Sequence, residues 1–392
     1  MTQAAQDNSK AGNPSGRFYN PALDGLRFVA FLGVFFHHMV QGDPEKYAAV
    51  RFLPHVLLTW IPTAARSFGG AAVDLFFVLS AYLITTLLTL EKERTGRIDV
   101  LAFYIRRALR IWPLYFAVLL ALLLSRQYWK PHVSLSYFLA SALFLGNWAL
   151  AFYRDGSPGP MTPLWSVSME EQYYAVWPWV VARFGPRTLA RIGWAIVTAS
   201  VAFRFCLWLT VSSYNEMSAI TFARMAPIGL GVILAVDGRF TACFQRLRFP
   251  LLWIAVSVAA IVALERPTAF GEIPSLYTAV VKVPATAVVC MLMVGVLVRE
   301  DCARIPVLSS PMLVYLGRIS YGLYLIHALA MEVVYRYLPH LVPGNKVLRG
   351  MLAMPSVLAL TIIAAAISFR FFEQPFLSLK GRFAKVQSGA GG

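Results

Sequence analysis

The chain has 392 residues, of which 58% are hydrophobic and 14% are charged, whereas an ordinary soluble domain carries about 25% charged residues. This composition excludes an ordinary soluble protein, and recurrent apolar runs of about twenty residues predict an all-α, polytopic transmembrane bundle in a lipid bilayer. The net charge of +16 predicts no nucleic-acid partner, because arginine and lysine gathered in cytoplasmic loops account for it.

The two ends of the chain differ from its middle. Residues 1–20 are polar and rich in glycine, serine, asparagine and glutamine, which predicts a disordered cytoplasmic tail. Residues 379–392 are expected to form a short basic cytoplasmic tail, and residues 21–378 a single transmembrane domain. No cleavable signal peptide is expected, because Arg27 and two histidines interrupt the first apolar stretch. The four cysteines show neither CxxC spacing nor a paired framework, so no disulfide or metal site is expected.

Eleven apolar segments follow one another between the tails. They lie near residues 23–41, 69–90, 110–124, 135–152, 169–184, 189–211, 222–236, 249–264, 280–298, 312–338 and 351–372. The positive-inside rule places four basic stretches in the cytoplasm: 91–110, 183–191, 237–249 and the C-terminal tail. An even number of crossings must separate the first two, so one of the three apolar segments between them is interfacial or re-entrant. We expect this to be 135–152, which leaves about ten crossings of the inner (plasma) membrane and both termini in the cytoplasm.

The charged and histidine side chains inside these segments fall at two depths. Arg27 lies at the inner end of the first segment, and His38 lies roughly 16 Å further along the helix axis. Asp74 and Glu170 lie near the outer ends of segments that run inward. Three more arginines gather at the cytoplasmic side: Arg106, Arg107 and Arg110. We therefore expect one end of the bundle to be cationic, with His38, Asp74 and Glu170 clustered towards the other end.

Two adjacent carboxylates occur in the aromatic stretch PLWSVSMEEQYYAVWP (163–178). Ser168 followed three residues later by Glu171 fits a capping box, which favours a structural role for Glu171. Glu170 points about 100° away around the helix. Because a carboxylate at membrane depth usually has a partner and a function, Glu170 is expected to be the functional one.

Several basic side chains admit two interpretations. His37 and His38 point about 100° apart, so only one can face a given cavity. A neutral histidine suits a general base near neutral pH, although a hydrogen bond to a neighbouring helix would also explain either ring. The arginine cluster either sets the topology or binds phosphate groups bidentately. Three further residues in apolar segments are most simply explained by a pair with a carboxylate of the bundle: Arg204, Arg318 and His327. Arg370 is most simply explained by a local ion pair with Glu373.

Six motifs occur in a fixed order along the chain. They are LDGLRFVAFLGVFFHH, GGAAVDLFFVLSAYLIT, YIRRALRIWPLYF, PLWSVSMEEQYYAVWP, ISYGLYLIH and FFEQPF. Over about residues 20 to 380 this order resembles the acyltransferase-3 family of integral-membrane O-acyltransferases. The first motif matches the R-x10-H element of that family through Arg27 and His38, which selects His38 over His37. The second resembles the second-helix motif of the family, with Ala81 where the family usually has glycine.

The resemblance implies acyl transfer from cytoplasmic acyl-CoA, with acetyl-CoA as the family default, to a hydroxyl group. His38 would be the essential base or a transient acyl carrier. Glu170 or Asp74 would hold its tautomer and stabilise the imidazolium. The CoA phosphates would be bound by four arginines: Arg27, Arg106, Arg107 and Arg110.

The expected acceptor is a hydroxyl of a cell-surface or exported glycan, and the alternatives are a small molecule such as a macrolide, or a lipid. Some family members carry an extracytoplasmic hydrolase-like domain, which is not expected in this sequence. Either the membrane domain then acylates its acceptor directly, or a separate extracytoplasmic transferase partner completes the transfer. A membrane transporter is the rival from another class, but it would not explain why the arginine cluster, the R-x10-H element and SMEEQ occur together.

Overall fold

The computed structural model describes residues 19–40, 55–128, 133–152, 159–210, 218–264, 275–299, 305–344 and 346–383. This part of the chain is helical and contains no strand, which confirms the predicted all-α fold. The longer elements are α2 (Pro21–Met39), α3 (His55–Thr95), α4 (Val100–Leu124), α5 (Leu135–Ala142), α6 (Gly146–Phe152), α7 (Leu164–Arg183), α8 (Pro186–Thr210), α10 (Ala226–Val236), α11 (Gly238–Gln245), α12 (Pro250–Leu264), α13 (Lys282–Leu297), α14 (Pro311–Arg318), α15 (Ser320–Leu341), α16 (Lys346–Ser368) and α17 (Gln374–Leu379). Short 3-10 or π turns are η2 (Arg126–Tyr128), η3 (Gly159–Met161), η4 (Phe222–Arg224), η5 (Tyr277–Val281), η6 (Phe369–Glu373) and η7 (Lys380–Phe383).

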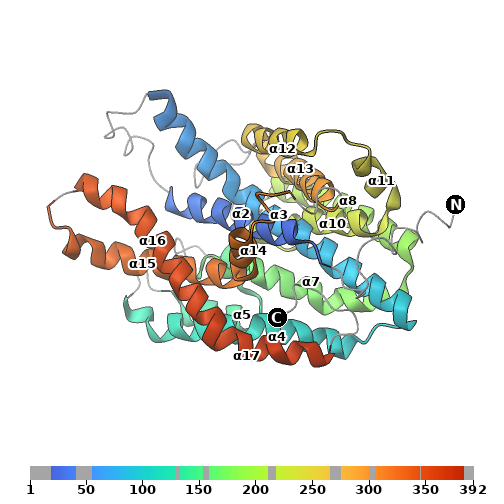
Figure 1. The fold of residues 1–392 in the computed structure, drawn as a ribbon, viewed down its shortest axis with the longest axis horizontal. Helices are drawn as coiled ribbons and strands as arrows, with labels where there is room; N and C mark the ends of the chain where they lie inside the picture. Colours follow the sequence, from blue (N-terminus) through green and yellow to red (C-terminus); the bar gives the residue numbers. More distant parts are fainter. Residues whose placement is uncertain are drawn as a thin grey trace.

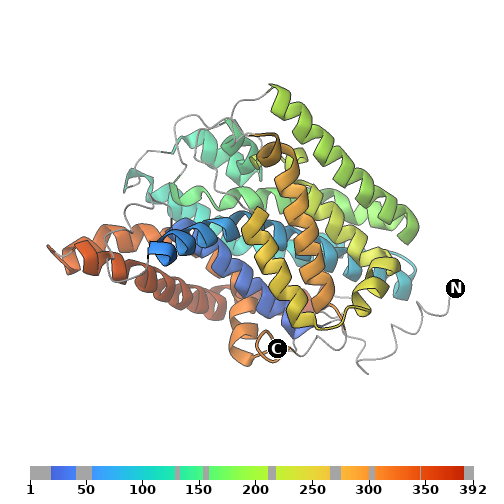
Figure 2. The same ribbon diagram turned by 90° about the horizontal axis from the view of Figure 1, so that it is seen from above.

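Helix α3 runs through the middle of the bundle and contacts α2, α7, α10, α12 and α13 (Figure 1). Helices α15 and α16 form a pair that projects from one side, while α8 lies along the outside (Figures 1 and 2). The core between α2, α3 and α15 is rich in fully buried aromatic side chains, among them Phe31, Phe35 and Phe77. Burial of such rings is a large share of the apolar stabilisation of a bundle.

The helices that carry polar residues begin at well-formed caps. Asn20 accepts a hydrogen bond from the backbone amide of Ala22, with Pro21 in the first turn of α2. Asp99 accepts one from the amide of Ala102 at the start of α4. Both side chains satisfy amides that the helix itself leaves unpaired. These caps fix where Arg27 and the α4 arginines stand along their helices.

Small residues allow α3 to approach its neighbours closely. A Cβ built on Gly33 of α2 would lie 2.9 Å from the Cβ of Ala72. A Cβ built on Gly231 of α10 would lie 2.4 Å from the carbonyl oxygen of Val78 and 2.8 Å from the Cβ of Ala81. Gly231 therefore makes room for the methyl group of Ala81, the residue that replaces a glycine in the second-helix motif.

Among the described residues, five helices are long and apolar enough to cross a membrane, or up to seven if two bent pairs each count as one span. The five are Phe68–Thr95, Val100–Leu124, Pro186–Thr210, Tyr277–Leu297 and Leu348–Phe383. By this measure the described residues confirm a polytopic helical protein, and the predicted count of about ten crossings is not reached. Of the predicted tails 1–20 and 379–392, residues 1–18 and 384–392 lie outside the described residues. Asn20 caps α2, and α17 ends at Leu379, followed by η7, which packs against α4.

The segment 135–152 is broken, as expected for a piece that does not cross as one helix. It forms α5 and α6, which meet at Phe144, whose φ is 55°. The amide nitrogen Nε2 of Gln172 donates to the carbonyl oxygen of Phe144 and to Oδ1 of Asn147, at 2.7 and 2.9 Å. Gln172 therefore connects α7 to the junction between α5 and α6. Its side chain pairs polar groups that the interrupted helix leaves without an intrahelical partner.

Two local predictions are wrong. Helix α7 begins at Leu164, a turn earlier than the predicted capping box, so Ser168 lies inside the helix and its Oγ donates to the carbonyl oxygen of Leu164. Glu171 accepts a hydrogen bond from Nε1 of Trp112 instead. In the last helix Arg370 donates to Gln374, while Glu373 accepts from Ser368. The π turn η6 alters the helical spacing on which the predicted Arg370–Glu373 pair depended.

Candidate active site

His38 and His327 form a hydrogen-bonded pair where the end of α2 meets α15. Nδ1 of His38 lies 2.8 Å from Nε2 of His327, and the two rings stack with an interplanar angle of 10°. His327 is fully buried, whereas His38 is partly exposed. The partner of His38 Nδ1 is thus another imidazole rather than the carboxylate expected from the sequence.

A second hydrogen bond determines which ring nitrogens carry protons. Nδ1 of His327 lies 2.6 Å from the backbone carbonyl oxygen of Tyr324. A carbonyl oxygen only accepts, so Nδ1 of His327 is the donor, and Nε2 of the neutral ring accepts. His38 must then donate from its Nδ1. In a neutral His38 the lone pair remains on Nε2, which is the nitrogen available as a base or nucleophile.

His37 points into a different environment. A Cβ built on Gly69 of α3 would lie 2.1 Å from Cγ of His37. The ring of His37 therefore occupies the space that Gly69 leaves open, and it meets the ring of His38 edge-on, with 5.5 Å between the centroids. Gly69 thus acts as a packing partner for His37, while His38 turns towards α15.

Asp74 lies on another face of α3. It is 1% exposed and forms an ion pair with Arg224 of η4, with 3.0 Å between Oδ1 and Nε. Ala72 faces α2 at Gly33. Asp74 follows two residues later in α3, so its side chain is rotated by about 200° around the helix axis, away from α2. Asp74 consequently pairs with η4, whereas the group hydrogen-bonded to Nδ1 of His38 is His327.

A cavity of about 820 Å³ opens between the N-terminal half of α2, the middle of α3, α4, α7, α15 and the C-terminal turns. This volume lies within the range of about 300–1,000 Å³ found for small-molecule and cofactor sites. Its lining includes five cations and two carboxylates: Arg27, Arg107, Arg110, Arg318, Lys380, Asp24 and Glu170. The excess of positive charge suits an anionic ligand.

Arg107 and Arg110 face this cavity without a carboxylate partner within 4 Å among the described residues. The guanidinium of Arg107 stacks on the rings of Phe103 and Tyr174, at 5.7 Å from each centroid. Arg110 donates to the backbone carbonyl oxygen of Arg318. Guanidinium groups held in this way by rings and carbonyls keep donors free for a phosphate.

Arg27 and Glu170 also line the cavity, but each has a partner in the protein. Arg27 is paired with Asp24 one turn earlier in α2, at 2.9 Å. Glu170 accepts a hydrogen bond of 3.2 Å from the hydroxyl of Tyr174. The structure therefore places Glu170 beside the arginines of the cavity, whereas the group hydrogen-bonded to Nδ1 of His38 is His327.

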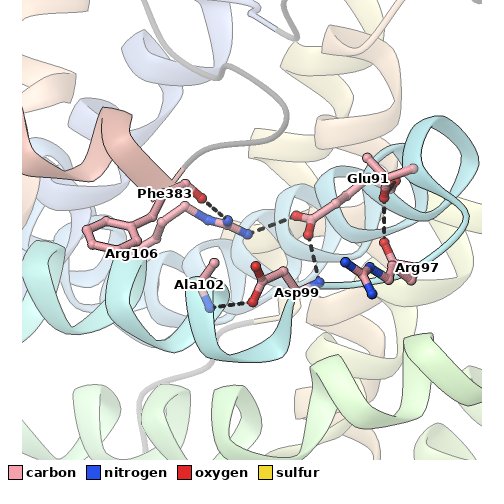
Figure 3. Close-up of polar contacts among 7 residues, drawn as sticks. Glu91, Arg97, Asp99, Ala102, Arg106 and Phe383 are labelled. Carbon is pink, nitrogen blue, oxygen red and sulfur yellow. Dashed lines mark hydrogen bonds and ion pairs between the residues drawn. The ribbon is translucent and has the colours of Figure 1, made fainter.

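Arg106 does not line the cavity. Its Nη2 lies 2.9 Å from Oε2 of Glu91, and its Nη1 donates to the carbonyl oxygen of Phe383 (Figure 3). The other carboxylate oxygen of Glu91 accepts from the backbone amide of Asp99. Of the three neighbouring arginines predicted to bind phosphate, two thus face the cavity and the first joins α3, α4 and the C-terminal turn.

Tyr324 connects the cavity to the histidine pair. Its side chain lines the cavity, and its hydroxyl is hydrogen-bonded to Ser166 and to the carbonyl oxygen of Pro163. Its own carbonyl oxygen is the acceptor for His327, which lies one helical turn further along α15. The cationic cavity and His38 are therefore neighbouring parts of one region, with His38 beyond the residues that line the cavity.

Three residues of this region were not assigned a site role from the sequence. They are His327, Arg224 and Lys380. A signal existed for His327, because it ends the motif ISYGLYLIH. The sequence gives no comparable signal for Arg224 or Lys380, since their positions depend on how η4 and η7 fold back onto α3 and α4.

These features define a helical membrane protein in which a cationic cavity adjoins a histidine pair. The chain belongs to the acyltransferase-3 family: the family model, described as an acyltransferase domain, matches residues 20–370. No solved structure matches the chain.

The curated relatives are O-acetyltransferases by name. The chain is 26% identical over 377 residues to the peptidoglycan O-acetyltransferase OatA of Listeria monocytogenes, covering 92% of this chain and 56% of the relative. It is 25% identical over 383 residues to a putative O-acetyltransferase of Staphylococcus aureus, covering 91% and 57%. A third relative, the O-acetyltransferase OatA of Staphylococcus aureus, is 28% identical over 229 residues, covering 55% and 34%. The chain thus spans little more than half the length of the first two relatives.

Proposed function

We propose that this protein is a membrane-bound O-acyltransferase that moves an acyl group, in the first instance acetyl, from cytoplasmic acyl-CoA to a hydroxyl of a cell-surface or exported glycan. The observation that carries the proposal is the pairing of His38 with His327 next to a cationic cavity, in which Arg107 and Arg110 have no carboxylate within 4 Å among the described residues. Family membership supports the reaction class. The names of the relatives support acetyl as the group and a glycan such as peptidoglycan as the acceptor.

The cavity would bind the donor through its phosphates. CoA carries several phosphate negative charges, and Arg107 and Arg110 offer guanidinium donors that no described carboxylate occupies. Arg27 of α2 lines the same cavity and adds a third guanidinium. With the phosphates at this end, the pantetheine arm would extend past Tyr324 towards His38.

Nε2 of His38 would perform the chemistry. As a general base it removes the proton of the acceptor hydroxyl while the oxygen attacks the thioester carbonyl. The C–S bond then breaks, and the CoA thiolate takes the proton from the imidazolium. In the alternative route, Nε2 itself attacks the thioester carbonyl, the C–S bond breaks and the CoA thiolate leaves. The acceptor hydroxyl then attacks the acyl-imidazole, the C–N bond breaks, and the hydroxyl proton passes to the thiolate. Both routes require the tautomer that the hydrogen bond to His327 selects.

His327 would act as the positioning residue for His38, the part first assigned to a carboxylate. Nε2 of its imidazole accepts the hydrogen bond from Nδ1 of His38 and stabilises the positive charge that develops on His38. Glu170 would instead serve the donor cavity, because its bond to Tyr174 helps to shape the wall on which Arg107 stacks. Asp74 would support the site indirectly by fixing α3 against η4.

Other acceptors and one other class remain alternatives. A macrolide, another small molecule or a lipid would use the same donor cavity and the same histidine. A separate extracytoplasmic transferase would be needed only if the acyl group leaves this chain before it reaches its final acceptor. A transporter would also fit a polytopic bundle with buried charges, but it needs no hydrogen-bonded histidine pair next to an anion site.

The test is transfer of labelled acetyl from acetyl-CoA by the purified protein in detergent, with peptidoglycan fragments, a macrolide and a phospholipid as separate acceptors. The proposal predicts a base-labile ester on the glycan together with stoichiometric release of CoA thiol, without any transmembrane gradient. Labelled ester only on the macrolide or the lipid would select those acceptors. Absence of both ester and thiol release with every acceptor, from protein that melts cooperatively, would contradict the enzyme assignment.

A further inference from the structure

The C-terminal end of the described chain forms part of the cavity wall. The chain turns through η7 after α17. Both elements line the cavity, α17 with Gln374, Leu377 and Ser378, and η7 with Lys380 and Gly381. Both α17 and η7 pack against α4, alongside which they lie in Figure 1. A segment expected from the sequence to be a basic tail therefore contributes a cation to the interior of the site.

Lys380 stands among charges of its own sign. The ammonium group is repelled by the guanidinium groups of Arg107 and Arg110, and no described carboxylate lies within 4 Å of it. Partly buried like charges raise the free energy of a folded protein unless an anion or water lies between them. Lys380, Arg107 and Arg110 therefore form a cationic cluster in the wall of one cavity, which an anion would stabilise.

Arg106 holds this segment in place. Its guanidinium donates to the carbonyl oxygen of Phe383, three residues after Lys380, and is fixed on its other side by Glu91, which is 2% exposed (Figure 3). Both oxygens of Glu91 are occupied, one by Arg106 and the other by the amide of Asp99. Glu91, Arg106 and the Phe383 carbonyl thus fasten η7 to the ends of α3 and α4.

We infer that Lys380 is a phosphate-binding residue of the acyl-CoA site, and that Arg106 is a positioning residue that holds η7 over the cavity rather than a phosphate ligand itself. The inference rests on the proposed function for the identity of the anion. The donor site would then be formed by residues of both α4 and the C-terminal turn η7. A phosphate bound between Lys380 and the two arginines would replace their mutual repulsion by charge-assisted hydrogen bonds.

The experiment compares two donors in the full-length protein. Acetyl-CoA carries phosphates, whereas S-acetylpantetheine presents the same thioester without them. Lys380→Gln should raise KM for acetyl-CoA by about tenfold or more, since a hydrogen bond to a charged group contributes about 1.5–3 kcal/mol. It should leave KM for S-acetylpantetheine unchanged, and Lys380→Arg should retain most of the affinity for acetyl-CoA. Arg382→Gln, which removes an exposed charge outside the cavity lining, is the matched control and should alter neither KM.

The positioning role has its own readout. Arg106→Gln and Glu91→Gln should each raise KM for acetyl-CoA, and combining Arg106→Gln with Lys380→Gln should add little, because both changes remove the same contact. Fully additive effects would show that Arg106 binds phosphate independently and would overturn its reassignment.

The outcomes separate this inference from the proposed function. If the unmodified protein transfers acetyl but Lys380→Gln leaves KM for acetyl-CoA unchanged, the inference is wrong and the enzyme assignment stands. An equal rise in KM for both donors would also overturn it, because phosphate recognition cannot act on S-acetylpantetheine. If the unmodified protein neither binds CoA in a calorimetric titration nor uses it, the donor assignment and the inference fail together.

Discussion

Nε2 of His327 lies 2.8 Å from Nδ1 of His38, and the carbonyl oxygen of Tyr324 lies 2.6 Å from the other nitrogen of His327. This chain of two hydrogen bonds leads from the wall of the cationic cavity to the proposed reactive nitrogen. It uses no carboxylate. The basicity of His38 is therefore governed by a buried neutral ring and a backbone carbonyl, both positioned by α15.

Replacing His327 should impair the chemical step more than donor binding. We expect His327→Gln to lower kcat by about 10²-fold or more, because the tautomer of His38 is no longer fixed and general-base catalysis contributes about 10²–10⁴-fold. KM for acetyl-CoA should change little, since His327 is not part of the cavity lining. Initial rates of thiol release at varied acetyl-CoA measure both parameters. A kcat close to that of the unmodified protein would remove His327 from the mechanism.

The two cavity arginines without carboxylate partners should govern affinity for the donor. Arg107→Gln and Arg110→Gln are each expected to raise KM for acetyl-CoA by about tenfold or more, from the loss of a charge-assisted hydrogen bond. Arg187→Gln, at an exposed position on α8, provides a control with the same loss of charge. Donor titrations with all three variants check the expectation, and equal KM values in the three would contradict it.

Breaking the buried pair between Asp74 and Arg224 should destabilise the fold. Removing one partner leaves an uncompensated buried charge, which costs about 3–5 kcal/mol. We therefore expect Arg224→Met to lower the thermal melting midpoint in detergent substantially, and Asp74→Leu combined with Arg224→Met to restore part of it. Arg239→Met is the control, because Arg239 pairs with Asp237 while 86% exposed, and surface pairs contribute about 0–1 kcal/mol. Similar melting midpoints for Arg224→Met and Arg239→Met would show that burial of the first pair is unimportant.

A methyl group at Gly231 should disturb the contact between α3 and α10. The built Cβ lies too close to the Val78 carbonyl oxygen and to the Ala81 methyl group, and overpacking of this kind costs about 1–3 kcal/mol. Gly350→Ala serves as the comparison, because nothing lies within 4 Å of a Cβ built there and alanine is favoured over glycine in a helix by about 1 kcal/mol. Thermal melting should show a decrease for Gly231→Ala and no decrease for Gly350→Ala. The reverse order would contradict the close packing of these helices.

Most of the architecture was predictable because apolar periodicity and charge placement are local signals. The all-α class, the broken segment 135–152 and the gathering of Arg107 and Arg110 near Arg27 all follow from such signals. The partners of individual side chains were not predictable in the same way. Which residue faces His38 depends on the crossing of α2 and α15, nearly three hundred positions apart in the chain.

The two carboxylates Glu170 and Asp74 illustrate the same limit. Glu170 and His38 were expected together because both were assigned to one depth in the bilayer, but depth says nothing about direction around a helix. Glu170 turns towards Tyr174 and the arginines, and Asp74 turns towards Arg224. Arg106 differs from its neighbour Arg107 for a similar reason, since about 100° of helical rotation takes one to Glu91 and the other to the cavity.

The central claim is that acyl transfer depends on His38 and not on the histidine beside it. The most direct measurement is the rate of CoA thiol release from acetyl-CoA, with a glycan acceptor, by His38→Ala and His37→Ala, each checked for a cooperative melt. The account predicts that His38→Ala loses activity by about 10²-fold or more, while His37→Ala stays within about threefold of the unmodified protein. Equal activity in the two variants would contradict it.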